Sequence, residues 1–179
     1  MSAYTLTATD SIVSNIVRKD ANGALVITES KREDYAVPPE GEYEWEITGF
    51  AEPFEMAKAA EFGGGMQTKT RLEFTILSGK GQGRKFNQMF TWSVGAKATL
   101  GQLIAKVRGQ GLSSGESFDL TDLLGMKGKS YVNHSLDLGG KVKTGPDGKP
   151  LYAEVAVKTI RPLSSGATPA TDENDDDWK

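Results

Sequence analysis

Acidic and apolar side chains alternate along Glu42-Tyr43-Glu44-Trp45-Glu46-Ile47-Thr48, and this short stretch decides the fold class. Successive side chains of a β-strand point to opposite faces of its sheet, so a period of two predicts a half-buried strand. The aromatic and aliphatic members of the stretch are expected to face the core, and the glutamates to face water. The chain is therefore expected to be built mainly from strands.

The segment 68–77 has the same period of two and predicts a second strand. The side chains expected to point inward are the apolar ones: Leu72, Phe74 and Ile76. The side chains expected to point outward are the charged ones: Lys69, Arg71 and Glu73. Between the two strands, residues 51–67 include three consecutive glycines and are predicted to form a loop.

One helix and three further strands are predicted downstream. The strands are expected over 84–92, 129–136 and 152–160. The segment 96–108 carries apolar residues at the i, i+3, i+4 and i+7 positions of one helix face: Leu100, Leu103, Ile104 and Val107. This order is that of an OB-fold, a five-stranded Greek-key barrel with one helix between the third and fourth strands. An SH3-like barrel or a small sandwich would lack a helix at that point.

Charge and composition divide the chain into three parts. Residues 1–40 form an N-terminal extension, in which Asp20-Ala21-Asn22-Gly23 is a candidate hairpin turn. Residues 41–163 are expected to form the OB-fold domain, and 41–162 carry a net charge of +3. Residues 164–179 are rich in Ser, Gly and Pro and are expected to form a disordered tail. The tail is acidic, since 172–179 carry a net charge of −4.

Several function classes are excluded by composition. The absence of cysteine excludes disulfides and thiolate metal sites, and the single histidine, His134, cannot form a histidine-rich zinc site. The glycine-rich run 79–85 is not a nucleotide-binding phosphate loop, because that motif needs Gly-Lys-Ser/Thr at the start of a helix and this run precedes a strand. We therefore expect no enzyme, no metal and no cofactor.

The sequence also argues against a membrane protein. No stretch approaches the roughly 18 consecutive apolar residues of a membrane span. The first residues, Met1-Ser2-Ala3-Tyr4-Thr5, lack the basic and then apolar layout of a signal peptide. A cytoplasmic protein without membrane association is expected.

Five runs of the chain resemble the OB-fold single-stranded DNA-binding proteins encoded by bacteriophages. They are Gly41-Glu42-Tyr43, Leu72-Glu73-Phe74, Gly83-Arg84-Lys85-Phe86, Leu123-Leu124-Gly125-Met126-Lys127-Gly128-Lys129 and Ile160-Arg161-Pro162. That family keeps an acidic C-terminal tail with an aromatic residue near its end. The matching tail residues here are Asp175, Asp176, Asp177 and Trp178, although this chain ends in Lys179.

The resemblance implies a sequence-nonspecific single-stranded DNA-binding protein that supports DNA replication or recombination in the host cytoplasm. It also implies that the acidic tail recruits replication or recombination proteins. Because the tail is anionic, it would also compete with DNA for the basic groove. A homo-oligomer is compatible with the sequence.

Candidate binding residues follow from what a single strand requires. OB-folds bind on the outer face of their second and third strands, between the loops that join strands one to two and four to five. Phosphates need cations, and bases need flat aromatic or apolar surfaces. The residues that fit are Lys69, Arg71, Lys85, Asn87, Trp92, Phe62, Met66, Lys141, Lys143 and Lys149. Core packing is the alternative role for the aromatic residues, and ordinary solvation is the alternative for the lysines.

A second function class stays open at this point. The same residues are compatible with a non-catalytic structural protein, or with a recombinase-accessory interaction protein, that has no affinity for nucleic acid. The preference between DNA and RNA is likewise open. Titration with oligonucleotides distinguishes these classes.

Overall fold

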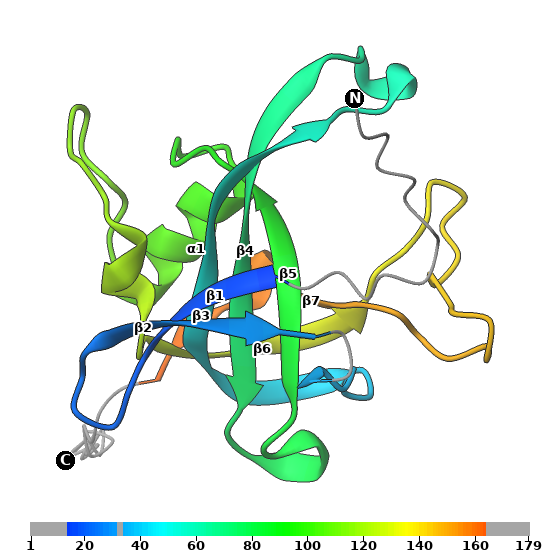
Figure 1. The fold of residues 1–179 in the computed structure, drawn as a ribbon, viewed down its shortest axis with the longest axis horizontal. Coiled ribbons are helices and arrows are strands. Elements are labelled where there is room, and N and C mark those ends of the chain that lie inside the picture. Colours follow the sequence, from blue (N-terminus) through cyan, green and yellow to red (C-terminus); the bar gives the residue numbers. More distant parts are fainter. Residues whose placement is uncertain (1–13, 32–33, 164–179) are drawn as a thin grey trace, which may run out of the picture.

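The computed structural model describes residues 14–31 and 34–163, and in these residues the chain is mainly β with one α-helix (Figure 1). The described strands are β1 (Ser14–Lys19), β2 (Leu25–Ser30), β3 (Gly41–Ala57), β4 (Met66–Ile76), β5 (Lys85–Thr91), β6 (Lys127–His134), β7 (Ala153–Val155) and β8 (Arg161–Pro162). The helix, α1 (Thr99–Arg108), lies between β5 and β6. The predicted mainly β fold with one helix at this point of the chain is confirmed.

The predicted count of five strands is wrong, because the described residues form eight. The N-terminal segment adds β1 and β2 to the sheet. The strand predicted over 152–160 is interrupted by a 3-10 turn at Val157–Thr159, which separates β7 from β8. At this turn the backbone N–H of Tyr131 donates a hydrogen bond to the Thr159 hydroxyl at 3.0 Å. In a continuous pair of strands that N–H would donate to a backbone carbonyl instead.

The strands β3 and β4 are longer than predicted and extend beyond the body of the sheet. The loop predicted over 51–67 is wrong, since β3 continues to Ala57 and β4 begins at Met66. The pairing register shifts between Ile47 and Gly49 and again between Ala51 and Phe54. Such bulges bend a strand and break its period of two. The second half of β3 therefore lacks the alternation from which a strand is predicted. Residues 55–68, called the arm below, form the projecting end of this hairpin (Figure 1).

The core lies on one side of this curved sheet and is covered by α1. The inward side chains predicted for β4 (Leu72, Phe74 and Ile76) are all buried, so the phase of that strand is confirmed. The predicted apolar stripe of α1 is also confirmed: Leu100, Leu103 and Ile104 are fully buried, and Val107 packs against the core from a partly buried position. At the centre, the indole N–H of Trp45 donates to Ser130 Oγ at 2.8 Å.

The pairings of β3 and β6 with their neighbours curl the sheet around this core. Strand β3 pairs with β4 along one edge, and along its other edge with β6 and then β1. Strand β6 in turn pairs with β7 and β8. The backbone N–H of Val155 in β7 donates to the side-chain oxygen of Gln88 in β5 at 2.8 Å, which brings these two strands together. The sheet is therefore compatible with a barrel-like fold.

The predicted N-terminal hairpin is confirmed. Strands β1 and β2 pair from Ser14↔Ser30 to Lys19↔Leu25. The Asp20 carboxylate closes the turn by accepting hydrogen bonds from the backbone N–H groups of Asn22 and Ala24 at 2.8 and 2.9 Å. In Figure 1 the hairpin crosses in front of β3, β4 and β5. Its position decides which part of the sheet is accessible.

Candidate nucleic-acid interface

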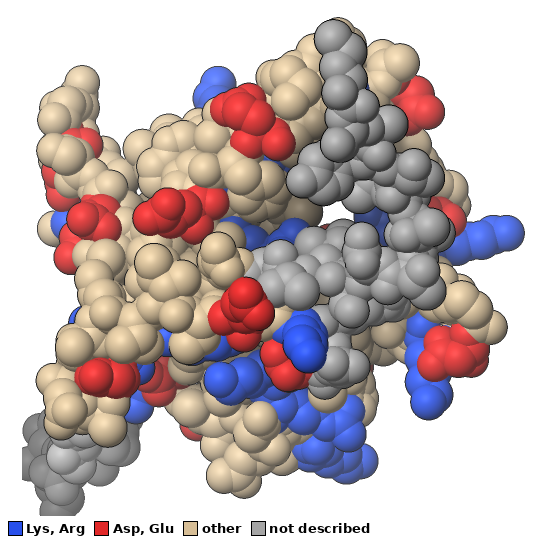
Figure 2. All heavy atoms as spheres, in the orientation of Figure 1, with Lys and Arg blue, Asp and Glu red and all other residues tan. Residues whose placement is uncertain are grey.

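The outer face of β3, β4 and β5 is the side of the sheet turned away from the core. Backbone register arranges its side chains in four rows across the strands, from the β4–β5 turn towards the arm: Glu46–Thr75–Lys85, Gly49–Glu73–Asn87, Ala51–Arg71–Met89 and Phe54–Lys69–Thr91. Figure 2 shows this side of the molecule, with Lys and Arg gathered over its lower part and Asp and Glu more frequent on its left. The structure thus places four of the predicted binding residues on one face, but in different rows.

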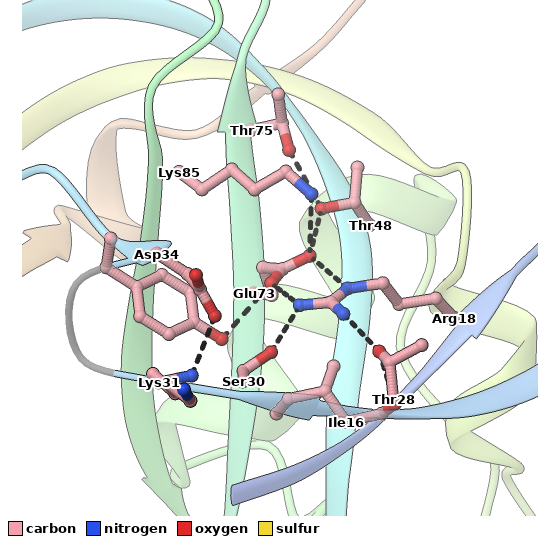
Figure 3. A network of polar contacts seen from close by, with 11 residues as sticks. Ile16, Arg18, Thr28, Ser30, Lys31, Asp34, Thr48, Glu73, Thr75 and Lys85 are labelled. Carbon is pink, nitrogen blue, oxygen red and sulfur yellow. Dashed lines mark hydrogen bonds and ion pairs between the residues drawn. The ribbon is translucent and has the colours of Figure 1, made fainter. Parts of the chain in front are cut away.

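Glu73, expected to face water, is completely buried, which corrects the sequence prediction. The cause is the β1–β2 hairpin, which lies over this part of β4 (Figure 3). Arg18 in β1 donates from Nε to Glu73 Oε1 at 2.9 Å and from Nη2 to Oε2. The Tyr35 hydroxyl donates to Oε2 at 3.1 Å, and the Thr48 hydroxyl donates to Oε1 at 2.9 Å. The carboxylate is therefore the centre of a polar network that attaches the hairpin to the sheet.

The charges in this network keep Glu73 ionised. Burial by itself would raise the pKa of Glu73, but the hydrogen bonds and charge of Arg18, with the charge of Lys85, lower the pKa below its ordinary value. The same hydrogen bond raises the pKa of Arg18. Arg18 also donates to the hydroxyls of Thr28 and Ser30 in β2, so one guanidinium ties both strands of the hairpin to β4.

Gly49 lets the hairpin approach the sheet closely. A Cβ atom at this position would lie 2.5 Å from Cγ2 of Ile16 and 3.2 Å from Cγ of Arg18, so a larger residue would push β1 away. The missing side chain and the buried carboxylate belong to the same row, Gly49–Glu73–Asn87. That row is the one covered by the hairpin.

The covered row contains Asn87 and separates Lys85 from the other predicted cations of this face, Lys69 and Arg71. The Lys85 ammonium lies 3.6 Å from Glu73 Oε1 and belongs to the network. Asn87 is half-buried in the covered row itself. Sequence reasoning missed this, because the pairing of Arg18 with Glu73 joins residues 55 positions apart.

Lys69 and Arg71 lie beyond the covered row, towards the arm. The Arg71 guanidinium lies 5.8 Å from the centre of the Phe54 ring, its neighbour across β3 and β4. Met89, in the same row as Arg71, is 37% exposed. This part of the face therefore combines two cations with an aromatic ring and a thioether. The sequence prediction did not include Phe54 or Met89. Phe54 could have been found, because Phe54 and Met56 alternate with polar or small residues inside the segment that was predicted to be a loop.

The arm carries the exposed apolar residues predicted for this region. Phe62 and Met66 are 58% and 64% exposed at its end, on either side of three glycines with positive φ. Met56, in register with Gln67 across the arm, is also exposed. These side chains extend the apolar surface outward from the Phe54–Lys69–Thr91 row.

The segment 135–151 forms a long loop after β6, which Figure 1 shows to the right of β5. Its three predicted phosphate ligands are all exposed: Lys141, Lys143 and Lys149. Isolated bridges between Leu136 and Val142 and between Thr144 and Pro150 shape the loop. The Lys149 ammonium lies 3.8 Å from Asp147 Oδ2, an exposed pair that is weak in water.

Trp92 lies away from these cations. It directly follows β5 and has the opposite phase to Thr91, so it belongs to the core-facing side of the sheet, where it lines a groove with Phe50. The predicted tail residues Asp175, Asp176, Asp177 and Trp178 lie outside the described residues.

Two more observations bear on the class of site. In residues 14–31 and 34–163, no helix has the length and apolar character required to cross a membrane. The same residues hold no group of three acidic or histidine side chains arranged to bind a metal ion.

Comparisons of the chain with known protein families, curated proteins and solved structures found no match.

Proposed function

We propose that this protein is a non-catalytic, sequence-nonspecific single-stranded DNA-binding protein whose body is an OB-type barrel. The barrel comprises β3, β4, β5, β6 and β7, and the β1–β2 hairpin is an addition to it. The order of these strands, the position of α1 after the third of them, and the pairing of β3 with both β4 and β6 support this assignment.

The observation that carries the proposal is the surface formed by Lys69 and Arg71 together with Phe54 and Met89. Cations next to accessible apolar groups, here the half-buried Phe54 and the exposed Met89, meet both needs of a single strand, whose phosphates are charged and whose bases have apolar faces. A duplex hides the faces of its bases in the stack, so only its phosphates could use this surface. Preference for a single strand is therefore expected.

The arm and the 135–151 loop complete the proposed site. The arm adds Phe62 and Met66 as apolar contacts, and the loop adds three lysines that can contact phosphates. The network around Glu73 bounds the site on the side of the β4–β5 turn, because the hairpin occupies that row. We therefore assign Lys85 and Asn87 to the margin of the site.

We include the acidic tail in the proposal on the strength of the sequence. Residues 172–179 carry −4, and an anionic segment tethered to a cationic groove competes with DNA at high effective concentration. Its Trp178 is the apolar residue expected to bind a replication or recombination protein.

A titration of labelled oligothymidine tests the function. We expect binding at low salt that is tighter than binding of duplex DNA of equal length, and that weakens as salt rises. An oligouridine of equal length measures the preference between DNA and RNA in the same assay. Absence of oligonucleotide binding at low salt would contradict the proposal and favour the interaction protein without nucleic-acid affinity.

A further inference from the structure

A second surface with different chemistry lies on the core-facing side of the sheet. An open groove of about 840 Å³ separates the β1–β2 hairpin from the segment 117–122. Phe50 and Pro53 of β3 lie between these walls. In Figure 1 the segment 117–122 lies to the left of β3, and the hairpin extends from that side across β3. The groove is thus separate from the rows that carry Lys69 and Arg71.

The groove has apolar walls that are open to solvent. Leu25 and Ile27 of β2 are 51% and 68% exposed, and Trp92 is 37% exposed. Single exposed apolar residues are common on protein surfaces, but three large ones around one hollow mark a binding surface. Burying them in a complex would remove apolar area from water.

The rim of the groove is acidic. Glu52, Asp119 and Asp122 are among its lining residues, and no described Lys or Arg lines it. The backbone N–H of Thr121 donates to Asp119 Oδ1 at 2.8 Å, and this hydrogen bond lowers the pKa of Asp119. Glu52 and Asp122 form no ion pair with any residue in the described part of the chain. Three carboxylates, none of them paired with a cation of the described residues, therefore face whatever enters the groove.

We propose that this groove binds a basic and apolar segment of a partner protein. Lysine or arginine side chains of the segment would neutralise the three carboxylates, and its apolar side chains would cover Leu25, Ile27 and Trp92. Nucleic acid is repelled by the acidic rim. The tail of this chain has the wrong charge for the groove, since 172–179 carry −4. The proposal does not depend on DNA binding, and it gives Trp92 a role separate from the outer face.

A peptide of alternating Lys and Leu is a suitable probe, with Trp92 as the reporter. We expect it to change the fluorescence of the full-length protein, and we expect Trp92→Phe to remove most of that change. A Lys-Ser peptide measures attraction by charge alone, and a Glu-Leu peptide keeps the apolar contacts but reverses the charge. Both should bind at least about tenfold more weakly, since each lacks one half of the interaction.

Matched variants locate the binding in the groove. Ile27→Thr keeps a β-branched residue at an exposed position of β2, and Glu52→Gln with Asp122→Asn removes two rim charges without changing side-chain size. Each is expected to weaken the Lys-Leu peptide about tenfold. Glu61→Gln, an exposed acid on the arm, is the control and should leave peptide binding unchanged. Circular dichroism verifies that the variants are folded.

Several outcomes would overturn the proposal. They are no binding of the Lys-Leu peptide, equal binding of the Lys-Ser peptide, and binding that survives the groove variants. Displacement of the peptide by oligothymidine would show that the groove belongs to the nucleic-acid site. If Ile27→Thr instead converts a dimer to a monomer in sedimentation, the groove is an interface between two copies of this chain.

Discussion

Arg18 and Glu73 form a two-pronged salt bridge between the N-terminal hairpin and strand β4 of the sheet, across 55 positions of sequence. The carboxylate has no exposed surface, and the arginine side chain is 19% exposed. A buried charge is stable only with its partner, because its lost hydration must be replaced by charge and hydrogen bonds. The pair therefore determines both where the hairpin lies and which rows of the outer face remain open.

Replacing Glu73 by alanine should lower the free energy of unfolding by about 3–5 kcal/mol, since the largely covered Arg18 would be left without its counter-charge. Urea denaturation measures the change. Glu61→Ala is the matched control, because Glu61 is exposed on the arm and should change stability by about 0.5 kcal/mol or less. Equal stability of the two variants would show that the salt bridge does not hold the hairpin.

The stability added by Glu73 should depend on pH in the acidic range. Folding lowers the pKa of Glu73 below its ordinary value of 4.5, so its contribution is complete above pH 4.5 and is lost as pH falls through the folded-state pKa. We expect the stability difference between the wild type and Glu73→Gln to shrink as the pH is lowered below 4.5. Urea denaturation from pH 7 to pH 3 tests this, and a constant difference over that range would contradict it.

Gly49→Ala should destabilise the protein by about 1–3 kcal/mol, the usual cost of an atom forced into a packed interior. The added Cβ would lie 2.5 Å from Ile16 Cγ2, so β1 must move. Ile16→Ala removes that neighbour, and the double variant should be more stable than the sum of the two single changes predicts. Thermal unfolding of all three variants measures this coupling. Additive effects would mean that the two residues do not touch.

Replacing Lys69 and Arg71 together by alanine should weaken oligothymidine binding without unfolding the protein. The slope of log affinity against log salt should become shallower by about 1.4, because each phosphate that a cation neutralises on a single strand contributes about 0.7. The control, Lys106→Ala with Lys158→Ala, removes the same charge from positions near α1. If the two double variants lose the same affinity, only net charge is involved and the outer face is not the binding site.

Lys85→Ala should behave differently from Lys69→Ala. The Lys85 ammonium lies 3.6 Å from Glu73, so its removal should reduce stability more than it reduces affinity for oligothymidine. Lys69 forms no ion pair with a described residue, so Lys69→Ala should reduce affinity for oligothymidine more than it reduces stability. Paired urea and binding titrations measure both quantities. A larger affinity loss at Lys85 would place the DNA across the hairpin.

Truncation after Leu163 should leave oligothymidine binding at least as tight as that of the full chain, because it changes the net charge from −3 to +1. Weaker DNA binding by the truncated chain would contradict competition by the tail.

Trp178→Ala should preserve DNA binding and reduce the capture of replication or recombination proteins, measured by pull-down from the host. Equal capture with and without Trp178 would contradict the recruitment role.

Local patterns in the sequence determined the first half of β3, the strands β4, β5 and β6, the helix, and the inward phase of the core. Alternation placed Tyr43, Trp45 and Ile47 inside, and helical spacing placed Leu100, Leu103 and Ile104 inside. These residues could be predicted because their periodicity depends only on backbone geometry. The hairpin turn at Asp20-Ala21-Asn22-Gly23 was predictable for the same reason, since its hydrogen bonds span four residues or fewer.

Only the tertiary structure decided which outward residues are accessible. Glu73 and Arg71 have the same phase on β4, yet Glu73 is buried, because β1 crosses above it at the space that Gly49 leaves open. Trp92 was predicted to contact DNA from the end of its strand, but it lies in the groove beside β2. Alternation assigns a side chain to a face of the sheet. Whether that face is covered depends on the packing of a segment far away in sequence, which no local pattern records.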